Sequence, residues 1–184
     1  MITLTKVLLI AATAVIGGAT ASYALQPAGA ATNPVERGRY LVATSGCNDC
    51  HTPWHLGAKG PEPDMSRLLS GHPANVEMPA APAGSPEWPT RASATMTAWA
   101  GPWGTSFTAN LTPDKATGLG AWTKDEFLGA LRTGRHQGRG RQILPPMPWP
   151  VYGQMTNADL ESIFAYLQTI PPIANKVPEP RLPQ

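Results

Sequence analysis

The sequence predicts a mostly α-helical fold with a long irregular insertion, and three observations lead to this expectation. Capped segments with a helical spacing of apolar residues occur at about 33–46, 123–134 and 156–170. No convincing strand pattern and no internal repeat appear. The stretch from about 56 to 107 is rich in proline, glycine and tryptophan and keeps no helical period. We therefore expect one helical core with this insertion wrapped around it.

Length and composition fit a single domain with a small regular core. The chain has 184 residues, which is enough to bury a hydrophobic core. Its 21 prolines and 18 glycines favour turns, while six tryptophans and the periodic helical segments argue against disorder. The formal net charge of +2 is small and dispersed, so nothing indicates a nucleic-acid-binding protein.

The first 30 residues have the pattern of an export signal. A positively charged start precedes an uncharged apolar run, and small-residue cleavage patterns end at Ala24 and Ala30. The uncharged run continues to about Leu25, so an uncleaved anchor in the inner membrane is the alternative. Both interpretations place residues 31–184, as one domain, in the periplasm. Disulfides are permitted in that compartment.

The three expected helices carry local start and stop signals. Asn33 can cap the first helix, with Pro34 at its first position and a glycine directly before the first cysteine. Thr123 and Glu126 have the spacing of a capping box for the second helix. Thr156 caps the third, and its apolar face comprises Leu160, Ile163, Phe164 and Leu167.

The string CNDCH, from Cys47 to His51, contains both cysteines of the chain. A thioredoxin-like dithiol would need a strand–helix setting, and a disulfide across two intervening residues would close a tiny, strained loop. Structural zinc would need further ligands, for which the remaining histidines are His55, His72 and His136.

Attachment of a c-type haem explains all three residues of this string. The thiols of Cys47 and Cys50 are spaced to bond the two vinyl groups of one haem, and His51 is then directed at the iron. We therefore favour one covalent haem c, with His51 as an axial iron ligand. The cofactor implies a redox function.

The second axial ligand is sought among the methionines. Met147 stands out because the segment ILPPMPWP surrounds it with prolines, which fix the backbone and could hold a weak thioether ligand in place. A core methionine in a rigid loop explains the same pattern. The methionines that we expect to have packing or surface roles are Met65, Met78, Met96 and Met155.

Several segments together resemble the class I c-type cytochromes, most closely those associated with bacterial membrane dehydrogenases. The segments that carry the resemblance are ERGRYLVATSGCNDCH, LLSGHP, TANLTPDKATGLGAWTKDEFLGALRTG, PPMPWPVYGQMTNADLESIFAYLQTIPPI and NKVP. The resemblance implies that the first and last helices cross and that loops enclose one haem. It also implies that Met147 is the distal ligand and that Trp122 and Arg132 contact the haem propionates. Dehydrogenase cytochrome subunits often carry three haems, whereas this chain has one attachment string.

With His51 and Met147 on the iron, no position is left for a substrate, so we expect an electron carrier and not an enzyme. Its partners would be redox proteins, such as a membrane dehydrogenase or an oxidase. One alternative is a docking or haem-relay subunit of a dehydrogenase complex, with an interface built from Trp88, Trp99 and Trp103. Another is a haem enzyme or sensor in which Met147 dissociates and His136 assists.

A basic segment precedes the methionine. RTGRHQGRGR places Arg132, Arg135, Arg139 and Arg141 close together in a nearly neutral protein. Positive charge near the haem would steer an acidic partner to the place where electrons cross. We therefore predict that Arg135, Arg139 and Arg141 form a docking surface.

Overall fold

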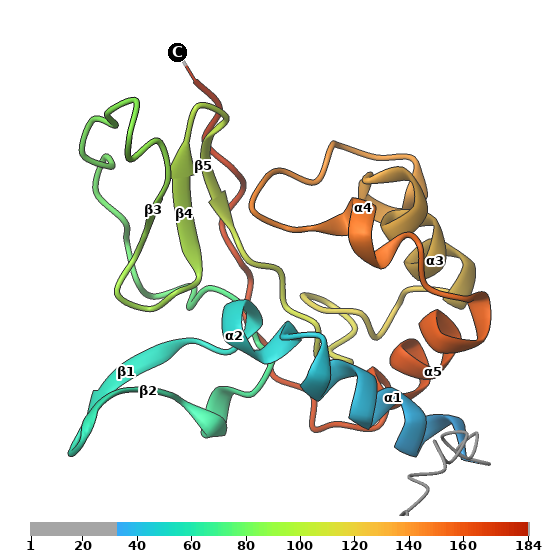
Figure 1. Ribbon diagram of the computed structural model, residues 1–184. Coiled ribbons are helices and arrows are strands. Elements are labelled where there is room, and N and C mark those ends of the chain that lie inside the picture. Colours follow the sequence, from blue (N-terminus) through green and yellow to red (C-terminus); the bar gives the residue numbers. More distant parts are fainter. Residues whose placement is uncertain (1–32, 184) are drawn as a thin grey trace, which may run out of the picture.

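The computed structural model of the chain describes residues 33–183, so the export segment predicted at 1–30 lies outside the described residues. Helices in this part are α1 (Pro34–Thr44), α2 (Cys47–His51), α3 (Lys124–Thr133), α4 (Trp149–Tyr152) and α5 (Asn157–Leu167), with 3-10 turns at Met65–Arg67 and His136–Gly138. Strands are β1 (Trp54–Gly57), β2 (Gly60–Pro63), β3 (Arg91–Ala92), β4 (Ala98–Gly101) and β5 (Gly104–Phe107). Figure 1 shows α3, α4 and α5 on one side and the strands on the other.

The three helices expected from the sequence are present as α1, α3 and α5. Asn33 caps α1, its Oδ1 accepting the Val35 N–H at 2.9 Å. Both hydrogen bonds of the capping box join Thr123 and Glu126 at the start of α3. This helix ends at Gly134, whose left-handed φ of 65° costs a glycine little. These boundaries were predictable because each depends on residues that are close in sequence.

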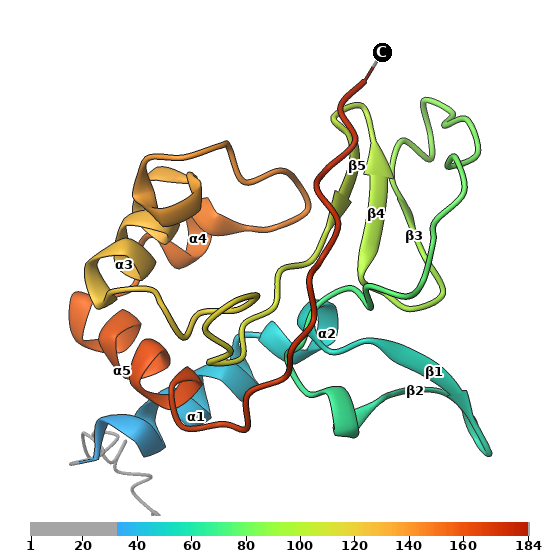
Figure 2. The ribbon, with the colours of Figure 1, turned by 180° about the vertical axis from the view of Figure 1, so that it is seen from behind.

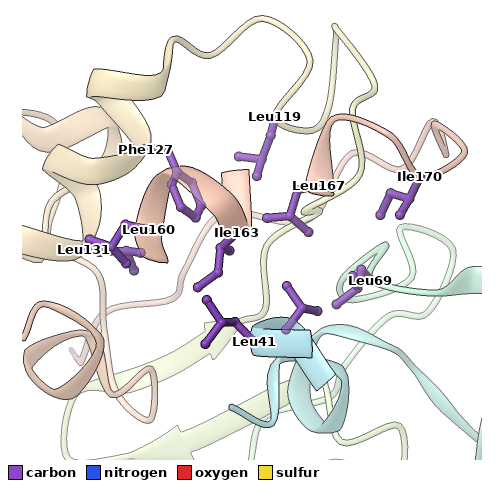
Figure 3. Packing of buried hydrophobic residues seen from close by; sticks show 10 residues of the cluster. Leu41, Leu69, Leu119, Phe127, Leu131, Leu160, Ile163, Leu167 and Ile170 are labelled. Atoms are coloured by element: carbon purple, nitrogen blue, oxygen red, sulfur yellow. The ribbon is translucent and has the colours of Figure 1, made fainter. Parts of the chain in front are cut away.

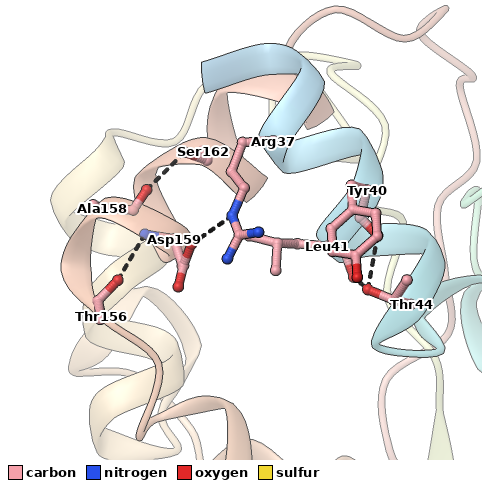
Figure 4. Close-up of polar contacts among 8 residues, drawn as sticks. All are labelled: Arg37, Tyr40, Leu41, Thr44, Thr156, Ala158, Asp159 and Ser162. Carbon is pink, nitrogen blue, oxygen red and sulfur yellow. Dashed lines mark hydrogen bonds and ion pairs between the residues drawn. The ribbon is translucent and has the colours of Figure 1, made fainter. Parts of the chain in front are cut away.

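The start of α5 has the expected cap and is also linked to α1. Thr156 caps the helix by accepting the Asp159 N–H at 3.1 Å. The Asp159 carboxylate accepts a hydrogen bond at 2.9 Å from Nε of Arg37, which lies on α1 (Figure 4). This partly buried ion pair ties the first long helix to the last.

Helices α1 and α5 pack tightly because α1 has a glycine at their closest approach. A Cβ added to Gly38 would overlap the carbonyl of Ser162 on α5, so only glycine permits this spacing. About one turn further along α1, Leu41 and Val42 are buried. Figure 3 shows how Leu41 faces Ile163 in the core. The buried cluster comprises Leu41, Val42, Leu69, Leu119, Phe127, Leu131, Leu160, Ile163, Leu167 and Ile170.

The expectation of an insertion without strands is wrong. Within residues 33–183, β1 and β2 form an antiparallel hairpin, and β3, β4 and β5 form an antiparallel sheet in that order. The sequence AGPWG, which indicates a loop, is the turn of the β4–β5 hairpin, where Gly101 pairs with Gly104. With two to four residues each, these strands are too short to show alternation in the sequence.

The chain after α5 is extended and lies beside the larger sheet. Figure 2 shows this segment rising from the end of α5 to β5. Thr105 and Arg181 exchange backbone hydrogen bonds of 2.7 and 2.9 Å, which brace the outer edge of β5. Among the helices described, none combines the length and the apolar character needed to span a membrane.

Candidate functional site

The string CNDCH forms α2, a single helical turn that begins after a two-residue link from α1. Gly46 links the two helices with a left-handed φ of 71°. The thiols of Cys47 and Cys50 are free and half-buried, and Cys47 packs against the hydrophobic core. Burial, assisted by the nearby Asp49 carboxylate, raises the pKa of Cys47 to about 11 and also raises that of Cys50. Dithiol oxidoreductases instead need a lowered thiol pKa, so this environment does not favour redox exchange.

His51, the last residue of α2, is buried and held in one orientation. The residue is only 8% exposed, and Nδ1 of its ring lies 2.7 Å from the carbonyl oxygen of Ala109. A carbonyl can only accept, so Nδ1 carries the proton and Nε2 keeps a free lone pair. Burial lowers the pKa of His51, which preserves this neutral form. An imidazole oriented in this way is suited to bind a metal through Nε2.

The chain segment around Gly71 lies directly behind this histidine. The Gly71 N–H donates to the backbone carbonyl of His51 at 2.8 Å, and the His72 N–H donates to that of Thr108 at 3.0 Å. Gly71 has a left-handed φ of 76°, and a Cβ there would overlap the backbone of Thr108 and Ala109. The LLSGHP segment therefore supports both His51 and its hydrogen-bond acceptor.

Two buried asparagines, each 3% exposed, join the loops on the histidine side. Nδ2 of Asn110 donates to the carbonyl of Ile173 at 2.8 Å. Nδ2 of Asn175 donates to the carbonyls of Ser70 and His72 at 2.7 and 2.9 Å. No pattern in the sequence predicted a role for either asparagine. Their presence in the segments TANLTPD and NKVP was the available signal.

Met147 lies in the connection between α3 and α4. Its side chain is half-buried and packs against the hydrophobic core, as does that of Cys47. After this segment, the Tyr152 hydroxyl donates to the carbonyl of Ser45 at 2.6 Å, which ties α4 to the residue at the end of α1. The role of Tyr152 could not be predicted from the sequence because its partner lies 107 residues away.

Comparison with known proteins adds independent evidence. No protein-family model matches the sequence. The chain is 29% identical to the fructose dehydrogenase cytochrome subunit of Gluconobacter japonicus over 98% of this chain and 30% of that protein. It is 28% identical to the gluconate 2-dehydrogenase cytochrome c subunit of Pantoea cypripedii, over 76% of this chain and 24% of that protein. It is also 28% identical to the alcohol dehydrogenase (quinone) cytochrome c subunit of Gluconobacter oxydans, over 79% and 24%.

The chain is a homologue of cytochrome c subunits of bacterial dehydrogenases. The relationship that the sequence motifs predicted is thereby confirmed. It supports the expectations of haem and of electron transport. The chain spans less than a third of the length of these relatives.

The donor set of this cytochrome homologue fits a c-type haem. One helical turn presents two free thiols together with an imidazole whose Nε2 lone pair is available. The other histidines have different surroundings. Both ring nitrogens of His72 are hydrogen-bonded, to Thr97 and to the carbonyl of Val76, and His55 is an exposed partner of Glu62. Among residues 33–183, no group of three His, Cys, Asp or Glu side chains is arranged to hold a metal ion.

Trp122 and Arg132, the residues predicted to contact the propionates, both contact other residues of the chain. The Trp122 ring lies edge-on to that of His136, with centroids 4.8 Å apart. The Arg132 guanidinium donates to the carbonyl of Gly153, to that of Met155 at 2.8 Å, and to Oδ1 of Asn157 at 2.7 Å. Arg132 thus ties α3 to the start of α5, and its contact with a propionate stays a prediction.

Two other tryptophans have buried donors without a partner among the described residues. These are the Nε1 atoms of Trp54 and Trp103. A buried N–H normally finds an acceptor, and a carboxylate would satisfy either group. Of the predicted interface tryptophans, Trp88 is 77% exposed, whereas Trp99 donates to the carbonyl of Met96 at 3.2 Å.

Two of the other methionines and two of the predicted docking arginines have the following surroundings. Met65 is 61% exposed, and Met155 packs against the core just before α5. Arg139 pairs with Glu126 at 2.8 Å, and Arg141 pairs with Glu179 at 3.3 Å. These exposed pairs reduce the positive charge that the arginine segment presents, and the docking role stays a prediction.

Proposed function

We propose that this protein is a single-haem c-type cytochrome that passes one electron at a time between redox proteins. The observation that carries the proposal is the short helix α2, whose thiols are free and whose His51 is held by Ala109 with Nε2 available. The packing of α1 on α5, through Gly38 and the Arg37–Asp159 pair, supports a class I cytochrome c fold.

Each residue of the site has one task in this proposal. Cys47 and Cys50 would hold the haem c through thioether bonds, His51 would bind the iron through Nε2, and Met147 would bind it through sulfur. Bound haem supplies a one-electron iron couple. A neutral sulfur ligand favours the ferrous form and raises the reduction potential. With His51 and Met147 both bound to it, the iron would have no coordination site left for a substrate, so we propose a carrier and not an enzyme.

The partners are inferred from the relatives. Because these are named as cytochrome subunits of fructose, gluconate and alcohol dehydrogenases, we propose a dehydrogenase as electron donor in the periplasm. The same names favour a second form of the function, in which the protein is a docking or haem-relay subunit of such a complex. A displaceable methionine with His136 as acid or base finds less support, because His136 is an exposed residue packed beside Trp122.

Mass spectrometry tests the cofactor. Protein produced in a host with haem-attachment machinery should carry one haem, and both thiols should be consumed. Cys47→Ala and Cys50→Ala should each leave at most one thioether and a poorly retained haem. Free thiols, or a mass that fits only a disulfide, would refute the proposal.

Absorption spectra test the distal ligand. The oxidised protein should show the weak red band of sulfur bound to ferric haem. Met147→Ala should abolish this band, open the iron to added ligands and lower the potential. Met155→Ala is the matched control, because Met155 also packs against the core. Loss of the band in Met155→Ala alone would assign the ligand to Met155.

A further inference from the structure

The insertion reaches the methionine segment through one hydrogen bond. Ser106 lies on β5 and is 8% exposed. Its hydroxyl donates to the carbonyl of Pro145 at 2.6 Å, and the alternative acceptor, the Trp99 carbonyl, is farther away at 3.4 Å. Pro145 stands two residues before Met147 in sequence. A side chain of the insertion therefore contacts the backbone that carries the proposed iron ligand.

This hydrogen bond matters because the methionine segment, residues 144–147, makes no other within residues 33–183. Pro145, Pro146 and Pro148 have no N–H to donate. The nearest backbone bonds lie outside the segment: the Ile143 N–H donates to Gly134 at 2.7 Å, and the Pro148 carbonyl accepts from Val151. Within residues 33–183, Ser106 makes the one hydrogen bond that residues 144–147 receive.

The strand that carries Ser106 is itself well supported. Ser106 pairs with Trp99 of β4 on one side. On the other side its neighbour Thr105 exchanges two backbone hydrogen bonds with Arg181 of the extended C-terminal segment. A hydroxyl on a strand that is paired on both sides can fix the position of Pro145, because its own backbone has little freedom to follow a moving loop.

We propose that Ser106 is a positioning residue for Met147, and that the insertion thereby controls how easily this ligand is displaced. The inference rests on the function proposed above. A thioether is a weak ligand, so the fraction of molecules in which it is detached depends on how tightly its loop is held. An added ligand can bind only that detached fraction, so its apparent affinity reports the loop restraint directly.

The experiment titrates imidazole into the oxidised holoprotein and follows loss of the red band. Ser106→Ala removes the hydrogen bond, and we expect imidazole to bind roughly fivefold more tightly than to the wild-type protein. Ser106→Thr keeps a hydroxyl at this position and should restore wild-type behaviour. Ser93→Ala is the matched control, because the Ser93 hydroxyl accepts from Ala98 of β4 at 3.0 Å but makes no hydrogen bond with Pro145.

The outcomes separate this inference from the proposed function. If the wild-type protein shows the red band and Ser106→Ala binds imidazole with unchanged affinity, the positioning role is refuted while ligation by Met147 stands. An equal effect of Ser93→Ala would also refute it, because general weakening of the sheet would then explain the result. A wild-type protein without the band would refute sulfur ligation itself, and the inference with it.

Discussion

The histidine side and the methionine side of the proposed haem site are built differently. His51 is buried, hydrogen-bonded to Ala109, and supported from behind by Gly71 and by the network of Asn175. Met147 is half-buried, and residues 144–147 around it receive one hydrogen bond from within residues 33–183, that of Ser106. The histidine side is a network of buried hydrogen bonds. The methionine side is a proline-rich loop that Ser106 of the insertion holds by a hydrogen bond.

The difference shows two ways of holding a side chain in position. Hydrogen bonds to buried groups are costly to break because the remaining partner stays unsatisfied. Prolines instead limit the conformations open to the chain, and they add no bonds. Substitutions on the histidine side should therefore reduce folding stability most. Those on the methionine side should change local properties with smaller losses.

Gly71→Ala should have the largest effect and would break the histidine side. The left-handed backbone costs an alanine roughly 1–2 kcal/mol, and overlap with Thr108 and Ala109 should bring the loss of unfolding free energy to about 3 kcal/mol or more. Gly46→Ala is the control, since Gly46 has a similar φ of 71° and an added Cβ there would meet only the side chain of Asp49, at 3.1 Å. Denaturant unfolding followed by tryptophan fluorescence measures both. Equal losses would mean that close packing behind His51 is unimportant.

Asn175→Ala tests the polar network. It leaves the buried carbonyls of Ser70 and His72 without their donor, so we expect a loss of about 2 kcal/mol or more. The exposed Asn75 provides the control substitution, Asn75→Ala, which should change stability little. The same unfolding experiment compares them, and a loss below that of the control would contradict the role given to this network.

Tyr152→Phe sharpens the contrast from the methionine side. It removes the one hydrogen bond from Tyr152 to the carbonyl of Ser45 and keeps the ring, so the expected loss is about 1 kcal/mol. Tyr40→Phe is the control, because Tyr40 is 58% exposed. A loss as large as that of Asn175→Ala would show that the two sides are equally demanding.

The smallest effect should be a pH dependence that arises on the histidine side. Burial lowers the pKa of His72, whose Nε2–H donates to Val76 while Nδ1 accepts from Thr97. Below the ordinary histidine pKa of about 6.5, the unfolded chain gains a proton there that the folded protein does not. The free energy of unfolding should therefore fall as the pH drops from about 6.5 toward the lowered value. Replacing His72 by Gln should flatten this dependence in unfolding curves measured across that range, and an unchanged slope would assign it to other groups.

The sequence predicted what depends on short-range patterns and missed what depends on distant partners. The capped helices and the string CNDCH were recognisable because their residues lie within a few positions of one another. The acceptor of His51 lies 58 residues away, and the carbonyls bound by Asn175 lie more than 100 residues away. Ser106 gave no signal either, since a serine in a glycine-rich segment has many explanations. The strands were missed because pairing, and not alternation, defines elements of this length.

The contact between α1 and α5 also has a consequence for how the chain folds. The Arg37–Asp159 pair joins positions that are 122 residues apart, so this interface can close only after almost the whole chain is available. Contacts between such distant positions slow folding, because the entropy of closing the loop is lost before the contact stabilises it. The cysteines directly follow α1, and Cys47 packs against a core that α5 completes. Until that closure occurs, the Cys47 thiol remains on a chain that has not yet buried it.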